Sequence, residues 1–387
     1  MTRVLELSAQ AAGGVRAHIR QVSQLLAKDG HQVLLAGPSN VISPAPGVVG
    51  GACLRTYQID IGARPSGADL KALRQLKQLA ATVEVIHAHG LRAGALAVLA
   101  AKRLPAAKRP RVVVTLHNLP VGSAPTRLVG KALHLVVVKG ADYVLTVSPD
   151  LLEKAKQLGL EAGEIAVVPA PARGCMDCGC MDHAAQPEIS QDSAQSSDAG
   201  SGVDSGSGYG ASSDTDAAPC LLTIARLAPQ KGLDLLLEAA TLIKQRGIDF
   251  TWLVAGDGPL KAQLNQQIAD AALPVKLLGR REDIGALLSQ ADVVVQTSYW
   301  EGQPLTLREA MQASRAIVAT DVGGSAYTLA GCGQLVEPQA GPLADAVVAV
   351  ITNPQRRETL EAASRAAVAK IPGETQLREQ LDRVLAL

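Results

Sequence analysis

The chain has 387 residues, of which 47% are apolar and 2% are aromatic. This length allows two or three domains, and with a single Phe their cores must be built mainly from Ala, Val and Leu. No stretch approaches the roughly 20 apolar residues of a membrane-spanning helix, and no secretory signal stands at the start. Six cysteines in so long a chain do not resemble a disulfide framework. We therefore expect a cytoplasmic enzyme.

The net charge of +1 hides an asymmetry along the chain. Residues 1–172 carry 20 Lys and Arg against 10 Asp and Glu, a net charge of +10. Residues 173–218 carry one Arg against eight acids, and residues 219–387 carry 16 basic and 18 acidic side chains. An anionic partner should therefore meet the first part of the chain.

In residues 1–172, short apolar segments rich in β-branched residues alternate with helical patterns. The clearest helical pattern spans residues 15–28, where Val15, Ile19, Val22 and Leu25 recur on one face. The predicted strands are 3–7, 32–36, 83–87, 112–116, 143–147 and 165–168. Such alternation is typical of a parallel sheet with helices on both faces.

The same alternation restarts in residues 219–371. The predicted strands there are 221–225, 249–255, 275–278, 293–297, 316–319 and 333–336. The sequence therefore predicts an α/β fold with two Rossmann-like, doubly wound parallel sheets. They would form two domains, 1–172 and 219–371, that face each other across a cleft, where such sheets bind ligands.

Two further segments complete the predicted organisation. Residues 173–218 are rich in Ser, Asp, Gly and Ala and have almost no large apolar residues, so we predict a disordered acidic insert. The tail, 355–387, is helical in pattern. It ends in an apolar stripe of Leu377, Leu381, Val384 and Leu385, which must pack on another surface.

Two glutamates, Glu301 and Glu309, stand eight positions apart on either side of a Gly-Gln-Pro break. Glu301 lies in a predicted loop and Glu309 in a predicted helix, so both carboxylates can reach one ligand. Carboxylates accept hydrogen bonds in pairs, which suits the vicinal hydroxyls of sugars.

Two cations, Arg226 and Lys231, follow the first strand of the second sheet. Arg supplies a planar fork of donors and Lys a point charge, so we interpret the pair as a diphosphate clamp, the alternative being a solvated loop. Gly13 and Gly14 open the first helix, where backbone N–H groups can approach an anion. The alternative is a tight turn with no ligand. The spaced glycines of a dinucleotide fingerprint are absent.

Three histidines, His87, His89 and His117, end two strands of the first sheet and could converge there. His87 and His89 share a face of their strand, and zinc binding is one interpretation. No third ligand of the right kind is evident, so hydrogen bonding by His117 in the cleft is favoured, with His87 or His89 structural.

A cysteine cluster is a second candidate metal site. Cys175, Cys178 and Cys180, with His183 nearby, could hold a soft metal. The cluster lies in the predicted insert, and no further cysteine pair follows at a zinc-like spacing. We therefore favour a flexible segment with exposed thiols and expect no metal in the chain.

Taken in order, these motifs resemble those of retaining glycosyltransferase family 4, whose members have the two-domain GT-B fold. The resemblance covers nearly the whole chain except residues 173–218, and the ordered set is far more specific than any single motif. The motifs are Gly13-Gly14, His87-x-His89, His117, Arg226-x4-Lys231, Gly256-x-Gly-Pro259, Glu301-x7-Glu309 and Asp321-Val-Gly-Gly324.

The resemblance implies transfer of a hexosyl unit from a nucleotide diphosphate sugar, with a UDP-sugar favoured over a GDP-sugar. The acceptor would be a hydroxyl of a glycan, a lipid-linked or phosphorylated molecule or a small molecule, as in the biosynthesis of cell-envelope glycans. No metal or other cofactor would be needed. The last helix, about 372–387, would pack back on the N-terminal domain.

Roles for single residues also follow from the resemblance. Arg226 and Lys231 would neutralise the diphosphate, Glu309 would bind the ribose, and Glu301 would bind the transferred sugar. His117 would lie near the sugar on the opposite wall. The rest of the donor site would comprise Gly13, Gly14, Gly256, Gly258, Pro304 and Leu305. Retention would follow from attack on the same face as the leaving phosphate, whose oxygen takes the acceptor's proton.

Two alternatives use the same frame: a GT-B nucleotide-sugar epimerase, and a non-catalytic binding protein on a decayed transferase. The chain also departs from the family's pattern at Gln303, where an apolar or aromatic residue is common. This departure removes no phosphate or ribose contact.

A basic cluster in the N-terminal part bears on the acceptor. Its members are Lys102, Arg103, Lys108, Arg109 and Arg111, followed by Arg127, Lys131 and Lys139. Loose docking on anionic lipid at the inner face of the cell membrane, or on a phosphorylated or lipid-linked acceptor, is the sharper interpretation. A solvated surface is the alternative. Nucleic acid is not expected, because neither a recognition motif nor stacking aromatics accompany the charge.

Overall fold

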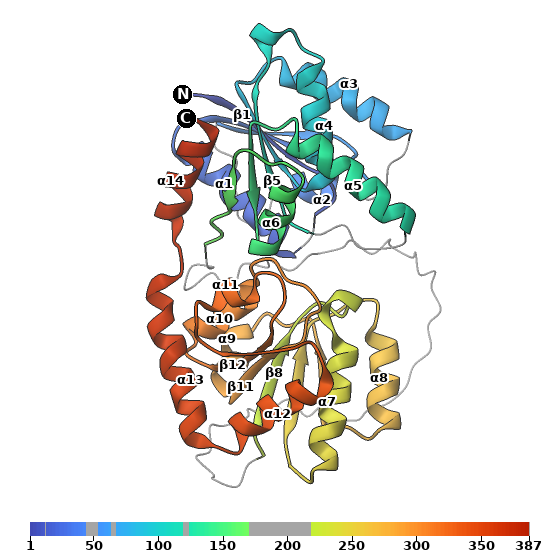
Figure 1. The fold of residues 1–387 in the computed structure, drawn as a ribbon, viewed down its shortest axis with the longest axis vertical. Coiled ribbons are helices and arrows are strands. Elements are labelled where there is room, and N and C mark those ends of the chain that lie inside the picture. The colour runs from blue at the N-terminus through green and yellow to red at the C-terminus, as the bar shows by residue number, and fades with distance from the viewer. Residues whose placement is uncertain (12, 44–52, 63–66, 119–123, 170–217, 387) are drawn as a thin grey trace, which may run out of the picture.

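The computed structural model describes residues 1–386 except 12, 44–52, 63–66, 119–123 and 170–217. The described residues form two parallel β-sheets, each with helices on both faces, in two domains (Figure 1). The predicted fold, two Rossmann-like doubly wound sheets, is confirmed. The segment predicted to be disordered, 173–218, lies outside the described residues except for its last one.

The first sheet has seven strands in the order β3-β2-β1-β4-β5-β6-β7. The strands are β1 (Arg3–Ser8), β2 (Gln32–Gly37), β3 (Leu54–Gln58), β4 (Val85–His89), β5 (Arg111–Leu116), β6 (Tyr143–Thr146) and β7 (Gly163–Ile165). The helices between them are α1 (Gly13–Lys28), α2 (Ser39–Ile42), α3 (Ala68–Ala80), α4 (Leu91–Lys102), α5 (Ala124–Val138) and α6 (Pro149–Gln157), with a short 3-10 turn, η1 (Ala106–Lys108), before β5.

Successive residues of each strand point to opposite faces of this sheet. Leu5 and Leu7 pack with α3 and α4 on one face, whereas Val4 packs with α1 on the other. On the α1 face the apolar residues occupy the beginnings of the strands. The ends of the same strands carry Glu6, His87, His89, Thr115 and His117, all buried.

The second sheet has six strands in the order β10-β9-β8-β11-β12-β13. They are β8 (Cys220–Ile224), β9 (Thr251–Ala255), β10 (Val275–Gly279), β11 (Val293–Gln296), β12 (Ala316–Thr320) and β13 (Gln334–Val336). One face is covered by α7 (Leu233–Gln245), α8 (Lys261–Asp270) and α12 (Ala340–Ile351). The other is covered by α9 (Ile284–Gln290), α10 (Leu305–Gln312), α11 (Ser325–Leu329) and α13 (Pro354–Ala367).

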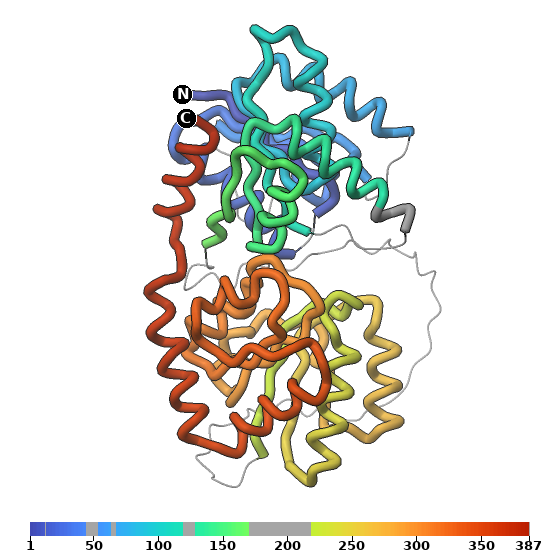
Figure 2. Tube along the Cα trace, in the orientation of Figure 1, coloured from blue at the N-terminus to red at the C-terminus, as the bar shows by residue number. Residues whose placement is uncertain are grey.

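The C-terminal helices run along one side of the molecule and return the chain to its starting domain (Figures 1 and 2). After α13, the turn η4 (Val368–Lys370) leads into α14 (Glu374–Leu385). The stripe of Leu377, Leu381, Val384 and Leu385 packs in one cluster with Val4, Val22 and Val85 of the first domain. Arg111 Nε also donates to the carbonyl oxygen of Val384 at 2.9 Å.

Two of the predicted strands were misplaced, and a third strand of the sheet was missed. The strand predicted at 83–87 is β4, two residues later, because His87 and His89 are paired inside the sheet. The strand predicted at 165–168 lies earlier, at β7. β3 was missed, because four of its five residues are exposed and its apolar pattern is weak.

None of the helices in the described residues is long and apolar enough to cross a membrane.

Candidate active site

A partly buried ion pair lies at the carboxyl edge of the second sheet. Lys231 ends the 3-10 turn η3 (Pro229–Lys231) after β8, and Glu301 lies in the loop between β11 and α10. Lys231 Nζ is 2.6 Å from Glu301 Oε1, and Ser298 Oγ donates to the same oxygen at 2.5 Å. Oε2 of this carboxylate has no hydrogen bond from the described residues and can accept one from a ligand.

The backbone around this pair is also joined. Thr297 Oγ1 donates to the carbonyl oxygen of Lys231 at 2.9 Å. The amide of Tyr299 donates to the carbonyl oxygen of Gln230 at 2.9 Å. Gly232 has a left-handed φ of +59°, and a Cβ there would lie 2.0 Å from the carbonyl oxygen of Thr297. Only glycine therefore lets the two loops approach so closely.

Arg226 stands at the same edge, directly after β8. It is exposed and forms no ion pair with the described residues. The Gly256-Asp-Gly258 turn after β9 packs against the loop that carries Arg226. A Cβ at Gly256 would be 1.9 Å from the carbonyl oxygen of Ala225, and one at Gly258 would be 2.5 Å from that of Leu227. The structure therefore brings both predicted cations and both predicted glycines to one edge.

The Asp321–Gly324 turn supports the Glu301 loop from the other side. The amide of Gly324 donates to the carbonyl oxygen of Glu301 at 2.9 Å. A Cβ at Gly323 would be 2.1 Å from that oxygen, and one at Gly324 would be 1.9 Å from the carbonyl oxygen of Gly302. The paired glycines thus let this turn lie directly on the loop that carries Glu301.

Glu309 lies on α10, which begins at Leu305 with Pro304 as its N-cap. Its side chain is half-buried and makes no hydrogen bond or ion pair within the described part of the chain. Burial raises the pKa of Glu309 to about 7. A carboxyl group with no partner and a shifted pKa marks a candidate binding residue.

Two helix starts face each other across the domains. A Cβ at Gly14, in the first turn of α1, would lie 3.5 Å from Leu305 Cδ1, in the first turn of α10. The first amides of a helix lack intrahelical acceptors and carry partial positive charge. The predicted residues Gly13, Gly14, Pro304 and Leu305 therefore meet at one place, and that place is suited to an anion.

A polar cluster fills the opposite wall, inside the first domain. Glu6 Oε1 lies 3.1 Å from His87 Nδ1, and Glu6 Oε2 lies 2.7 Å from His89 Nε2. His89 Nδ1 lies 3.2 Å from His117 Nε2. The three histidines converge as predicted, with a fourth, His18 of α1, whose ring centroid is 6.0 Å from those of His89 and His117.

The electrostatics of this cluster follow from its burial. Burial alone would raise the pKa of Glu6, but the charge and hydrogen bonds of His87 and His89 lower it to about 2. Burial lowers the pKa of His18 to about 3 and that of His89 to about 4. Burial and the neighbouring histidines also hold the pKa of His117 well below its usual value. Near neutral pH the carboxylate is therefore ionised and these three histidines are neutral.

Glu6, His18 and Arg308 were not predicted from the sequence. Glu6 completes a group of three potential metal ligands with His87 and His89, whereas no third ligand was evident in the sequence. A lone acid inside an otherwise apolar strand was the available signal. His18 and Arg308 lie in helical patterns that give no such signal.

Arg308 is 2% exposed and lies on α10 beside Glu309. It donates to Gln303 Oε1, and Gln303 Nε2 donates to the carbonyl oxygen of Ala166 in the first domain at 2.7 Å. Burial lowers the pKa of Arg308 to about 10. Gln303, the departure from the family's pattern, thus joins the two domains.

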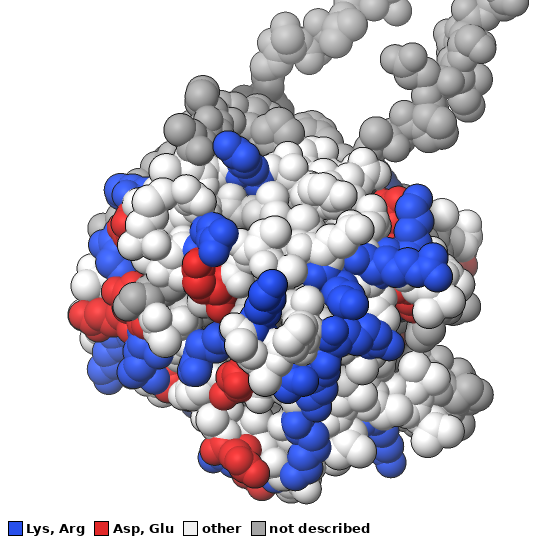
Figure 3. Space-filling model, turned by 90° about the horizontal axis from the view of Figure 1, so that it is seen from above, with Lys and Arg blue, Asp and Glu red and all other residues white. Residues whose placement is uncertain are grey.

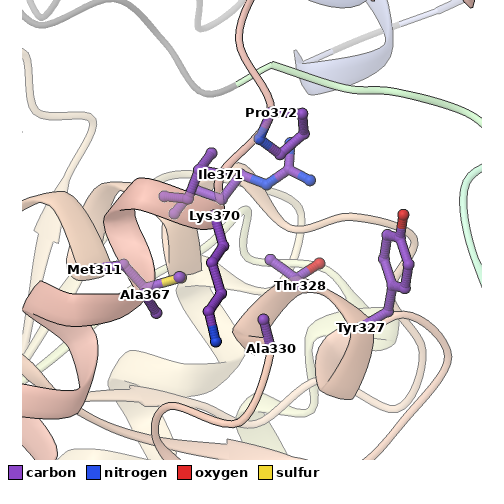
Figure 4. Close-up of a pocket in the computed structure, with 9 residues that line it drawn as sticks. Met311, Tyr327, Thr328, Ala330, Ala367, Lys370, Ile371 and Pro372 are labelled. Atoms are coloured by element: carbon purple, nitrogen blue, oxygen red, sulfur yellow. The ribbon is translucent and has the colours of Figure 1, made fainter. Parts of the chain in front are cut away.

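A cavity of about 190 Å³ lies on another side of α10 (Figure 4). Its lining is Arg308, Met311, Tyr327, Thr328, Ala330, Ala367, Lys370, Ile371 and Pro372. The labelled side chain of Lys370 points away from Pro372, so its charge lies at one end of the cavity (Figure 4). None of the predicted site residues lines it, and it is distinct from the edge that carries Lys231 and Glu301.

Comparison with known proteins agrees with this geometry. Two family models match the chain: Glycosyl transferase 4-like domain over residues 13–171, and Glycosyl transferases group 1 over residues 218–353. Between them they cover both domains.

The chain belongs to the family 4-type glycosyltransferases.

Relatives of this glycosyltransferase include the phosphatidyl-myo-inositol mannosyltransferase of Mycobacterium tuberculosis, 28% identical over 92% of this chain and 89% of the relative. The alpha-D-kanosaminyltransferase of Streptomyces kanamyceticus is 32% identical, but that match spans only 38% of this chain and 39% of the relative. Among solved structures, Anabaena HepE in complex with UDP-glucose is similar over the full length of both chains, with a TM-score of 0.70 and 18% identity. This last likeness shows the shared GT-B fold.

The glycine at 232 provides a test of the ion-pair geometry. Gly232→Ala should lower the free energy of unfolding well beyond the roughly 1–2 kcal/mol of a left-handed non-glycine residue, because the new Cβ meets the Thr297 carbonyl. Gly247→Ala is the matched control, since Gly247 has a φ of +71° and a Cβ there would meet nothing within 4 Å. Urea unfolding of both variants measures the difference, and equal losses would contradict the proposed close approach.

Proposed function

We propose that this glycosyltransferase moves a hexosyl unit from a nucleotide diphosphate sugar to an acceptor hydroxyl, with retention of anomeric configuration. A UDP-sugar is the first choice of donor and a GDP-sugar the alternative. The observation that carries the proposal is the Lys231–Glu301 pair at the cleft edge of the second sheet. Arg226, which is exposed, and Glu309, which has no partner among the described residues, belong to the same domain.

The charges at this edge match those of such a donor. Departure of a nucleoside diphosphate places negative charge on its phosphates, where Arg226, Lys231 and the starts of α1 and α10 would stabilise it. Glu301 Oε2 is open to the hydroxyls of the transferred sugar, and Glu309 is open to those of the ribose. HepE, which shares the fold, is solved with UDP-glucose, and this supports the same kind of donor here.

The roles of the carboxylates support retention without a covalent intermediate. Glu301 already accepts bonds from Lys231 and Ser298 on Oε1, which holds it as a binding group rather than a free nucleophile. Among the described residues of the opposite wall, Glu6 is buried and paired with two histidines. We infer attack by the acceptor on the face of the leaving phosphate, whose oxygen takes the proton, with His117 beside the reacting sugar.

The acceptor side of the proposal rests on the basic cluster. Lys102, Arg103, Lys108 and Arg109 are exposed and form no ion pair with the described residues. Lys and Arg side chains gather on the end of the molecule that Figure 3 shows. A hollow of about 350 Å³ lies among Lys102, Arg109 and Arg111. The side chain of Arg127 lies outside the described residues.

The position of this cluster favours a membrane over an acceptor phosphate. Arg111 begins β5, whereas His117 follows its end, so the hollow lies roughly 20 Å from the cleft edge, by the rise of a strand. On α5, Leu128 is 70% and Leu135 49% exposed, on the same face as Lys131. Exposed apolar residues among cations are typical of a helix that rests on anionic lipid.

A donor panel tests the proposed function. UDP-, GDP- and ADP-linked hexoses are compared by thermal shift and by slow hydrolysis without acceptor, and the anomer of any transfer product is read by NMR. One nucleotide class should stabilise the protein and be hydrolysed. Lys231→Ala should lower kcat by about 10²-fold, whereas Lys276→Ala, an exposed lysine of β10, should not. Stabilisation by no donor would indicate a binding protein, and an epimerised sugar would indicate the epimerase.

The pH dependence of donor binding tests the role of Glu309. Its pKa of about 7 means that the carboxyl group is largely protonated at pH 6, when it accepts hydrogen bonds poorly. Donor binding therefore strengthens as pH rises through 7, and Kd should be about tenfold weaker at pH 6 than at pH 8. Calorimetry with the intact nucleotide sugar, whose phosphates are esterified, checks this. Glu309→Gln should bind weakly with no such dependence; an unchanged slope would place the titration elsewhere.

Vesicle binding tests the membrane contact. The protein should co-sediment with vesicles containing phosphatidylglycerol at low salt and dissociate at high salt. Changing Lys102, Arg103 and Lys108 to Gln should weaken binding by about 10²-fold, since each cation near such a surface contributes about 1 kcal/mol. The same change at Lys244, Lys276 and Arg365 of the second domain is the control. Equal binding by both triple variants would remove this surface from the proposal.

A further inference from the structure

We propose that Glu6, acting through His89, holds His117 in the neutral form that carries its proton on Nε2, so that Nδ1 is the acceptor available to a sugar hydroxyl. Glu6 and His89 are then positioning residues for the proposed transfer, and the inference rests on that function. Nothing in the motifs assigns such a role to Glu6.

The chain of contacts begins at a carboxylate that can only accept. Both oxygens of Glu6 face a ring nitrogen, His87 Nδ1 at 3.1 Å and His89 Nε2 at 2.7 Å. An ionised carboxylate has no proton to donate. Both of these nitrogens must therefore carry hydrogen.

The second contact fixes His117. A neutral imidazole has one donor and one acceptor nitrogen, so His89, which donates from Nε2, has a lone pair on Nδ1. That lone pair lies 3.2 Å from His117 Nε2, which must then be the donor. His117 is neutral as well, so its own lone pair is left on Nδ1.

The third contact shows that only His89, and not His87, passes its tautomer on to another ring. His87 Nε2 faces Thr115 Oγ1 at 2.8 Å, and a hydroxyl can donate or accept. With its proton on Nδ1, His87 accepts from Thr115 on Nε2, and this contact has no consequence beyond Thr115. His89 instead transmits its state to another ring. The two histidines share the carboxylate and the burial but differ in what lies beyond them.

The location of His117 gives the fixed tautomer a use. His117 follows β5 at the cleft edge, and its carbonyl oxygen is 3.8 Å from the position that a Cβ of Gly302, next to Glu301, would occupy. A lone pair there accepts a hydrogen bond from a hydroxyl, whereas an N–H would have to donate one. The arrangement would thus select the orientation of a hydroxyl on the transferred sugar or the acceptor.

A metal ion is the competing occupant of this cluster. The ligand atoms of Glu6, His87 and His89 lie within 4.8 Å of one another. A metal would take the lone pairs of His87 Nδ1 and His89 Nε2. His89 would then carry its proton on Nδ1 and donate to His117 Nε2, leaving an N–H on His117 Nδ1. Protons on His87 Nδ1 and His89 Nε2 therefore predict one tautomer of His117, and a metal ion bound there predicts the opposite one.

Nitrogen NMR of protein labelled with ¹⁵N-histidine decides between them without any activity assay. The chain has seven histidines, which single substitutions can assign. At neutral pH, His89 and His117 should each show a protonated Nε2 and a bare Nδ1, and elemental analysis should show no bound metal. A proton on His117 Nδ1, or one metal ion per chain, would overturn the proposal.

Three variants then test the consequence for catalysis. His89→Leu removes the acceptor of His117 Nε2–H, so the His117 signals should shift toward a mixture of tautomers and kcat should fall about tenfold, with the donor KM little changed. His89→Gln should restore most of kcat, because its amide can donate to Glu6 and accept from His117. His87→Leu is the matched control and should leave the His117 signals as in the unmodified protein.

The outcomes separate this inference from the proposed function. Equal losses of kcat in His87→Leu and His89→Leu, with unchanged His117 signals, would show a purely structural cluster and overturn the inference while transfer stands. Absence of transfer in the unmodified protein would overturn the proposed function, whatever the tautomer. Should His89→Leu fail to fold, the unmodified protein and His89→Gln still report the tautomer.

Discussion

The ion pair between Lys231 and Glu301 is the interaction on which the donor side depends. Two opposite charges withdrawn from water are costly unless their geometry is good and their remaining hydrogen-bonding capacity is met. Here Ser298 meets part of it, and Gly232, Gly323 and Gly324 let three loops lie within contact of the pair. The loops are therefore specified by the need to place one carboxylate. Its second oxygen, which accepts nothing from the described residues, can bind a ligand. This accounts for glycines at positions where the sheet itself requires none.

The first domain handles buried charge in a different way. Its carboxylate, Glu6, is satisfied by hydrogen bonds from two buried imidazoles rather than by a Lys or Arg side chain. A column of apolar side chains would need less free energy to bury, and the starts of the same strands carry such residues, Val4 and Val85. A polar column confined to the cleft ends of the strands therefore points to function rather than stability. His18, whose Nδ1 is buried without a partner among the described residues, adds to this cost.

The sequence was sufficient for the fold and for part of the site, for identifiable reasons. Apolar periods of strand and helix are local, so both sheets could be placed, and Lys231 and Glu301 stood out because each lies at the end of an apolar run. Glu6 and His18 could not be placed, since their contacts depend on which strands are neighbours and on how α1 lies over them. β1 pairs with β4 across 81 positions, and only that register sets Glu6 beside His87. Arg308 was missed because a charge on an amphipathic helix is ordinarily solvated.

The contacts between the domains are of two kinds. On the C-terminal side, α14 buries an apolar stripe in the first domain, which is a broad and non-directional attachment. On the cleft side, Trp300 and Leu305 pack on the first-domain cluster, and the polar contacts are single, such as Trp300 Nε1 donating to Asp150 Oδ2 at 2.8 Å and Gln303 donating to Ala166. Breaking one polar contact costs little compared with exposing the stripe. The glutamate loop can therefore exchange its cross-domain bonds for bonds to a ligand while the domains stay joined. Both the Lys231–Glu301 pair and the His117 wall are placed where that exchange occurs.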